Sequence, residues 1–136
     1  MKVSFTCKGH PNIRAEHNRT IEFTKDPDLT ERGDCIIGVS CDFDPQEVKK
    51  LRGKVRIRVR LGDLEDSFSA YINPNFDDDN EIVFRKSGVR TVRTLGTQLN
   101  KGSSRLDRSI VERMKDPSSI MHVELESRKE VSDGEG

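Results

Sequence analysis

The sequence predicts one mainly β domain, an antiparallel sandwich or barrel that carries two short helices. Short runs in which apolar and polar residues alternate recur along the chain, whereas apolar residues at helical spacing are confined to its margins. Strands and helices do not alternate regularly, which argues against a parallel α/β sheet. A chain of 136 residues has the size of one domain. We assign residues 1–126 to that domain and residues 127–136 to a flexible polar tail.

Residues 3–8 and 13–24 are each predicted to form a strand, because apolar side chains occur at nearly every second position. The sequence Gly-His-Pro-Asn at 9–12 is typical of a turn. The two strands are therefore expected to pair as a hairpin, and residues 9–17 form its turn and the start of its second strand.

A turn at residues 32–35 precedes the most apolar run of the chain. Residues 35–41 are rich in β-branched side chains and are apolar at successive positions. A strand that is covered on both faces has this composition. Gly38 lies inside the run and indicates close approach by another part of the protein.

Local signals predict the remaining elements. Asp44 followed by Pro45 marks the start of a short helix, and Gly53 marks its end. Clear alternation predicts strands at 54–61 and 64–72. The later elements are strands at 81–85 and 89–95, an amphipathic helix at 104–115 and a last strand at 121–125.

The composition restricts the classes of function. Lys and Arg together number 24, as do Asp and Glu, so binding driven by charge requires a local patch. Three cysteines without regular spacing predict no disulfide framework and favour a reducing, cytoplasmic location. No apolar run approaches the length of a signal sequence or a membrane span, so we expect no membrane partner. The composition does not distinguish a monomer from an oligomer.

The leading candidate site lies where the 9–17 hairpin approaches the 32–35 turn. Both segments carry polar side chains, and guanidinium groups suit a carboxylate or a phosphate. We therefore expect a small polar or anionic ligand at the mouth between them. The alternative interpretation is that these side chains only hold the turn in place. The candidate ligand-binding residues are His10, Asn12, Arg14, His17, Arg32, Asp34 and Cys35.

A second hypothesis is an RNA- or DNA-binding module that uses the basic strand at 54–60. Lys54, Arg56, Arg58 and Arg60 share one face of this strand and would follow a phosphate backbone. Tyr71 on the returning strand would stack against a base. A solvated sheet face that resists aggregation has the same pattern.

A third hypothesis is a Cys/His-dependent or metal-dependent enzyme. Cys35 would be the nucleophile and His17 its base, with Arg32 favouring the thiolate. A zinc ion at Cys7, His10, His17 and Cys35 is the metal alternative, but the spacing matches no standard zinc motif and we expect no cofactor. An assembly subunit would instead carry an exposed apolar patch.

The first third of the chain resembles an archaeal family catalogued as domain of unknown function 371. The similarity rests on GHPNIRAEH at 9–17, TIEFTKD at 20–26 and LTERGDCIIGV at 29–39, and it extends more loosely to 82–87 and 106–108. The resemblance implies an archaeal cytoplasmic protein with a jelly-roll-type β fold, and it brings no activity with it. The polar residues of the candidate site match the family's signature, which favours that location.

Overall fold

The computed structural model describes residues 1–127. The predicted tail at 127–136 lies outside the described residues except for Ser127, which ends the last strand. The α-helices are α1 (Pro45–Val48) and α2 (Arg108–Met114), and a 3-10 turn, η1, spans Ser103–Arg105. The strands are β1 (Lys2–Lys8), β2 (Thr20–Thr24), β3 (Ile36–Gly38), β4 (Lys54–Leu61), β5 (Leu64–Ile72), β6 (Glu81–Arg85), β7 (Thr94–Thr97) and β8 (Ile120–Ser127).

The predicted mainly β class with two short helices is confirmed. All eight strands belong to one sheet in the order β1-β8-β4-β5-β7-β6-β2-β3, which is not closed into a barrel. The sheet is mixed rather than antiparallel throughout, because β2 pairs with β3, and β6 with β7, in parallel. The jelly-roll connection that the resemblance implies stays a prediction.

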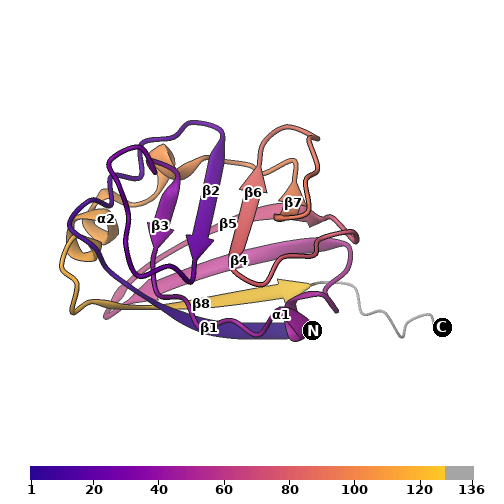
Figure 1. Ribbon diagram of the computed structural model, residues 1–136, viewed down its shortest axis with the longest axis horizontal. Helices are drawn as coiled ribbons and strands as arrows, with labels where there is room; N and C mark the ends of the chain where they lie inside the picture. Colours follow the sequence, from indigo (N-terminus) through magenta and orange to yellow (C-terminus); the bar gives the residue numbers. More distant parts are fainter. Residues whose placement is uncertain (128–136) are drawn as a thin grey trace.

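The sheet folds over so that its two halves face each other across the core. In Figure 1 the short strands β2, β3 and β6 run steeply across the long strands β4, β5 and β8. Phe5 on β1 contacts Phe23 on β2, with ring centroids 5.4 Å apart, and Phe68 contacts Phe84 at 6.3 Å. These ring pairs connect the two halves of the sheet, since alternate residues of each strand point inward.

The predicted pairing of residues 3–8 with 13–24 is wrong. β1 pairs with β8 from Lys2↔Glu126 to Lys8↔Ile120, and β2 pairs with β6 and β3. Residues 9–19 form a connection with no strand, in which Ala15 has a φ of 50° that a strand does not accommodate. The apolar alternation there arises because the connection itself contributes buried side chains to the core.

Two later elements also differ from the prediction. Residues 86–93 form a loop, and the strand expected at 89–95 is β7, beginning at Thr94. The helix expected at 104–115 is divided into η1 and α2, because Asp107 lies between them and caps α2 by accepting a hydrogen bond from the backbone N–H of Ser109 at 2.8 Å. The predicted start of α1 is confirmed, since Asp44 caps it and Pro45 is its first residue.

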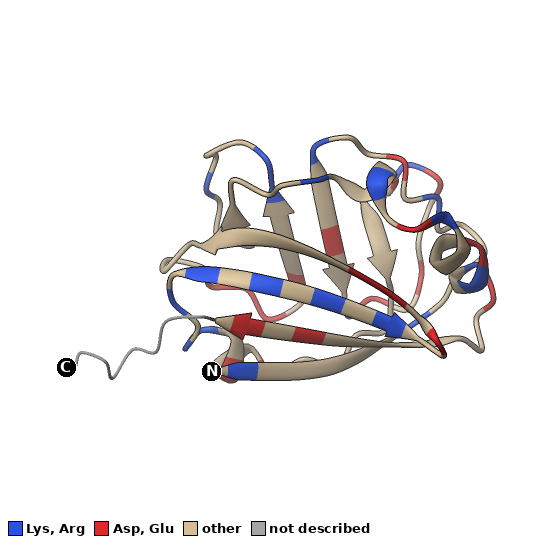
Figure 2. Ribbon diagram, turned by 180° about the vertical axis from the view of Figure 1, so that it is seen from behind, with Lys and Arg blue, Asp and Glu red and all other residues tan. Residues whose placement is uncertain are grey.

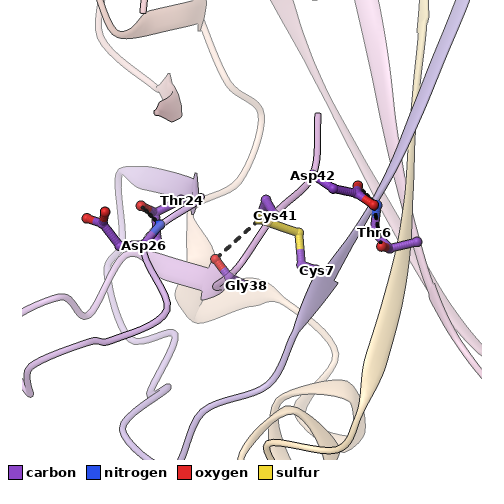
Figure 3. The surroundings of a disulfide bond; sticks show 7 residues. All are labelled: Thr6, Cys7, Thr24, Asp26, Gly38, Cys41 and Asp42. Carbon is purple, nitrogen blue, oxygen red and sulfur yellow. Dashed lines mark hydrogen bonds between the residues drawn. A yellow bond between two sulfur atoms is a disulfide. The ribbon is translucent and has the colours of Figure 1, made fainter. Parts of the chain in front are cut away.

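A disulfide joins Cys7 to Cys41 and corrects the expectation that these cysteines are reduced (Figure 3). Sequence spacing could not show the bond, because the segment after β3 reaches β1 only in the folded chain. Its backbone donates from Cys41 to the carbonyl of Thr24 at 3.0 Å and from Asp42 to the carbonyl of Thr6 at 3.1 Å. The disulfide therefore connects the edge strand β1 to the segment that follows the opposite edge strand β3.

Gly38 illustrates how closely these edges approach. A Cβ atom at this position would lie 2.6 Å from the Cβ of Cys7, which is too close for any side chain. The close approach predicted from Gly38 is therefore present, and the segment that approaches is β1 at Cys7. Within residues 1–127, none of the helices combines the length and the apolar character needed to cross a membrane. The cytoplasmic location stays a prediction.

Candidate functional site

The 9–17 connection and the 32–35 turn do lie side by side. The backbone N–H of Glu16 donates to the carbonyl of Asp34 at 2.9 Å. The hydroxyl of Ser103 contacts the carbonyls of His17 and Asp34, each at 3.2 Å, so η1 holds both segments. Two guanidinium nitrogens of Arg108 donate to the carbonyls of Arg14 and Ala15, each at 2.9 Å.

The candidate side chains in the first segment are used within the protein. His10 Nε2 lies 3.0 Å from an Asp28 carboxylate oxygen, and its Nδ1 accepts from the backbone N–H of Asn12. The side-chain amide of Asn12 donates to the carbonyl of Leu29 at 2.7 Å. Arg14 forms an ion pair with Glu16 at 2.6 Å and also donates to the Glu31 carbonyl. These contacts hold the connection against the 28–31 segment.

Four candidates remain, and the side chains of two of them, Arg32 and Asp34, have no hydrogen bond or ion pair among residues 1–127, whereas His17 and Cys35 have local partners. Arg32 is exposed. His17 Nδ1 accepts from the backbone N–H of Arg19 at 3.1 Å. The Cys35 thiol donates to Glu22 at 3.4 Å. His17 therefore does not act as the hydrogen-bond partner of Cys35.

The chemistry of Cys35 differs from that of an activated nucleophile. Burial and, to a smaller extent, the negative charge of Glu22 raise the pKa of its thiol to about 12. A thiolate nucleophile needs the opposite shift. The zinc hypothesis also loses a ligand, since Cys7 belongs to the disulfide, and the described residues contain no group of three metal-ligating side chains.

The basic strand lies in the middle of the outward face formed by β1, β8, β4 and β5. Figure 2 shows β4 as a stripe of alternating cations with acidic residues on the neighbouring strands. Arg58 contacts Glu124 on β8 at 2.5 Å and Glu65 on β5 at 3.8 Å. Lys54 lies over the ring of Tyr71, 5.9 Å from its centroid. The charge of the ladder is therefore partly neutralised by its own sheet.

A hollow of about 790 Å³ opens on this face over β1, β8 and β4. Asp42 closes one side, where its carboxylate accepts from the backbone N–H of Thr6 at 2.7 Å and from its hydroxyl at 3.0 Å. Arg60 and His122 are direct cross-strand neighbours, and neither side chain has a partner among the described residues. The lining residues are Ser4, Phe5, Thr6, Asp42, Arg58, Arg60, Glu65, His122, Val123 and Glu124.

Sequence reasoning identified the two arginines of this hollow but missed His122. The signal that would have found it is the alternation in the last strand, which puts His122 and Glu124 on the outward side. Their pairing with Arg60 and Arg58 depends on the order of strands, and the sequence alone does not provide that order.

A second polar cluster surrounds Glu22 on the other half of the sheet. Burial raises the pKa of the Glu22 carboxyl to about 7, and repulsion from Glu81 contributes to the shift. Arg93 pairs with Glu81 at 2.6 Å and partly offsets that repulsion. Glu22 is only 5% exposed, so this cluster is a poor site for a dissolved ligand.

Two comparisons with known proteins agree with the resemblance found in the sequence. A family model described as Domain of unknown function (DUF371) matches residues 5–128. An uncharacterized protein of Methanocaldococcus jannaschii is 29% identical over 130 residues, which cover 89% of this chain and 96% of the relative. The resemblance is therefore confirmed, and neither description names a ligand or a reaction.

Proposed function

The chain belongs to the DUF371 family, and we propose that it binds a small anionic ligand in the hollow over β4 and β8. Carboxylates and phosphates are the classes that the side chains suit. The observation that supports this proposal is the pair formed by Arg60 and His122, which are adjacent across the two strands and have no partner among residues 1–127.

The hollow is lined by two arginines and by the carboxylates of Asp42, Glu65 and Glu124, so a compact anion would bind at the end where Arg60 and His122 lie. The charge of Arg58 is compensated by Glu124, so this arginine keeps its position without supplying net charge. Arg60 retains all its guanidinium donors, which match the oxygens of a carboxylate or phosphate. The neutral imidazole of His122 supplies a donor, and its protonated form supplies a charge as well.

The hollow has more support than the mouth between residues 9–17 and 32–35. A small ligand at that mouth would compete with Asp28 for His10 and with Glu16 for Arg14. Only Arg32 among the candidate cations there is free in the described part of the chain. The mouth therefore remains the second location for the same ligand class.

Titration with inorganic phosphate and with citrate, followed by NMR of the histidine rings, tests the proposal. We expect the His122 signals to shift on titration, and we expect Arg60→Ala to weaken binding at least tenfold, as loss of a charged hydrogen bond would. Arg56→Ala is the matched control, because Arg56 is exposed on the same strand face and does not line the hollow. Equal affinity in the wild type and Arg60→Ala, or shifts confined to His10 and His17, would contradict this location.

Nucleic acid on the face of Lys54, Arg56, Arg58 and Arg60 is a second candidate function. The continuous stripe of cations in Figure 2 and the exposed ring of Tyr71 favour it. Glu124 and Glu65 oppose it, because they approach Arg58 from both sides. An RNA affinity that falls steeply with salt and is lost on removal of these cations would support this function.

A further inference from the structure

The short half of the sheet has a marked difference in charge between its two ends. β2 and β6 are antiparallel, with Thr20 opposite Arg85 and Thr24 opposite Glu81. The start of β2 and the end of β6 therefore lie together, and basic residues flank them. The opposite end is bordered by acidic residues, and Figure 2 shows red at the lower end of β6 and in the loop that leads into it. The net charge of zero conceals this separation.

Three segments meet at the basic end. The backbone N–H of Lys86 donates to the carbonyl of Arg19 at 2.9 Å, and that of Leu99 donates to Arg85 at 2.9 Å. The backbone N–H of Ser104 donates to the carbonyl of His17 at 2.9 Å. These three segments, residues 17–19, 85–93 and 98–105, border this end of the fold, from which residues 92 and 93 return along β6, where the carbonyl of Val92 accepts from the backbone N–H of Asp77 at 2.7 Å. The three segments contain seven Lys and Arg residues and no Asp or Glu.

Four of these seven cations make no side-chain contact with other described residues. Arg93 pairs with Glu81, Lys101 pairs with Asp66, and Arg85 donates to the hydroxyl of Thr94. The cations without a hydrogen bond or ion pair among residues 1–127 are Arg19, Lys86, Arg90 and Arg105, which we name the cationic rim.

We propose that the cationic rim binds the sugar–phosphate backbone of nucleic acid. Several uncompensated cations spread along one border suit a partner with repeated negative charges, and a phosphate backbone carries them at regular spacing. Three of the four are arginines, whose planar forks suit phosphate oxygens. The rim is separate from the anion hollow over β4 and β8. The hollow, unlike the rim, is lined by both arginines and carboxylates.

The side chains around the rim favour the backbone of nucleic acid over other polyanions. The exposed large apolar residue at this border is Val89, and none of its residues is Phe, Tyr or Trp. Stable protein interfaces have apolar or aromatic centres, and membrane-surface segments carry larger apolar side chains. The rim itself has no ring on which bases stack, so it would contact phosphates rather than bases. We therefore expect little preference for the sequence of the nucleic acid.

Fluorescence anisotropy with a labelled single-stranded RNA tests the proposal on the full chain. We expect binding at about 50 mM salt and at least tenfold weaker binding at about 200 mM. A triple variant, Arg19→Ser with Lys86→Ser and Arg90→Ser, should lose at least tenfold in affinity, and its salt slope should fall by about 2. Exposed substitutions of this kind leave stability nearly unchanged, and urea unfolding checks this.

A second triple variant with the same loss of charge is the control. It carries Lys8→Ser, Lys50→Ser and Lys115→Ser, which are exposed cations outside both the rim and the hollow, and we expect it to retain RNA affinity within about twofold. Loss in this variant alone, or equal loss in both, would overturn the assignment to the rim. No RNA binding at low salt would also overturn it, as would rim-dependent binding to phosphatidylglycerol vesicles without RNA binding. None of these outcomes depends on whether phosphate binds beside Arg60.

Discussion

Glu22 on β2 and Glu124 on β8 occupy the outward side of the same sheet, yet their carboxyl groups have opposite pKa shifts. Burial raises the pKa of Glu22 to about 7, whereas the hydrogen bond from Arg58 lowers that of Glu124. All five residues of β2 are buried, while the outward residues of β8 are exposed or half-buried. The two halves of one sheet therefore place two glutamate side chains in different environments, one buried and one partly exposed to water.

The difference shows that burial determines how much a polar contact contributes to the free energy of unfolding. On the open half, water solvates any charge that loses its partner, so each ion pair contributes little. On the covered half, an unpaired polar atom has no water to replace its partner, so each hydrogen bond matters more. Substitutions on the covered half should therefore have larger effects than matched substitutions on the open half.

The disulfide that connects the two edges should have the largest effect. Its cysteines are separated by 34 positions, and removing a cross-link of this size costs about 3 kcal/mol in the free energy of unfolding. Urea unfolding of Cys7→Ala with Cys41→Ala measures this cost, and Cys35→Ala is the control outside the bond. Alkylation of the denatured, unreduced protein should modify one thiol per chain. Modification of three thiols would show that the edges are not bonded.

Glu22 should make the covered half sensitive to pH. Its pKa is about 7 in the folded protein and near 4.5 in the unfolded chain, so the folded state binds the proton more tightly. The associated stability is complete below about pH 4.5, is lost as the pH rises through 7, and amounts to about 3 kcal/mol. Glu22→Gln should remove this dependence and be more stable than the wild type at pH 8.

Glu124→Gln is the matched control for Glu22→Gln. The depressed pKa of Glu124 means that its contribution is present above the unfolded pKa and is lost as the pH falls through the folded pKa. Urea unfolding at pH 3, pH 5 and pH 8 measures both variants, because the contribution of Glu124 changes only below about pH 4.5 and that of Glu22 changes above it. The comparison between the halves would be wrong if the two variants changed the pH dependence in the same direction.

Thr94 and Thr6 provide a comparison without charge on the substituted residue. The Thr94 hydroxyl is fully buried and contacts Arg85 Nε at 3.1 Å and the backbone N–H of Thr91 at 3.1 Å. Thr94→Val leaves both donors unsatisfied and should cost about 1.5 kcal/mol. Thr6→Val removes a hydroxyl that faces the exposed Asp42 and should cost well under half as much. Thermal unfolding compares the two variants. Equal losses of stability would contradict the conclusion that burial increases the contribution of a hydrogen bond.

The ion pair between Arg58 and Glu124 should have the smallest effect. Although the contact is 2.5 Å long, both side chains remain partly exposed, so a double-mutant cycle with Arg58→Ala and Glu124→Ala should give a coupling smaller than the loss caused by Thr94→Val. The coupling should decrease in high salt. A coupling larger than that loss would mean that the open face is far less hydrated than its exposure indicates.

Sequence patterns predicted the elements whose signals are local. The alternation of residues 54–61 produced β4 as expected, and Gly53 and Gly62 beside it have the φ values of 78° and 63° that their turns require. The same alternation misled at 9–24, because Ile13 and Ala15 are buried from a connection rather than from a strand. Alternation of apolar and polar residues predicts which side chains reach the core. It does not predict which segment, if any, the backbone pairs with.

The candidate sites show the same division. Sequence reasoning found the cations of β4 and the approach of residues 9–17 to the 32–35 turn. It did not find the side chains from distant strands that complete each cluster. Glu22 with Cys35, and Arg60 with His122, are brought together by strand pairing and sheet curvature.

The sequence by itself determined the mainly β class, the cap of α1 and the charge of the outward face of β4. These depend on interactions between residues that are near each other in the chain. The tertiary structure decided that β1 pairs with β8, that Cys7 bonds Cys41, and that Glu22 is buried while Glu124 is solvated. Each of these depends on which distant segment covers a given face, and burial of the common core selects that arrangement.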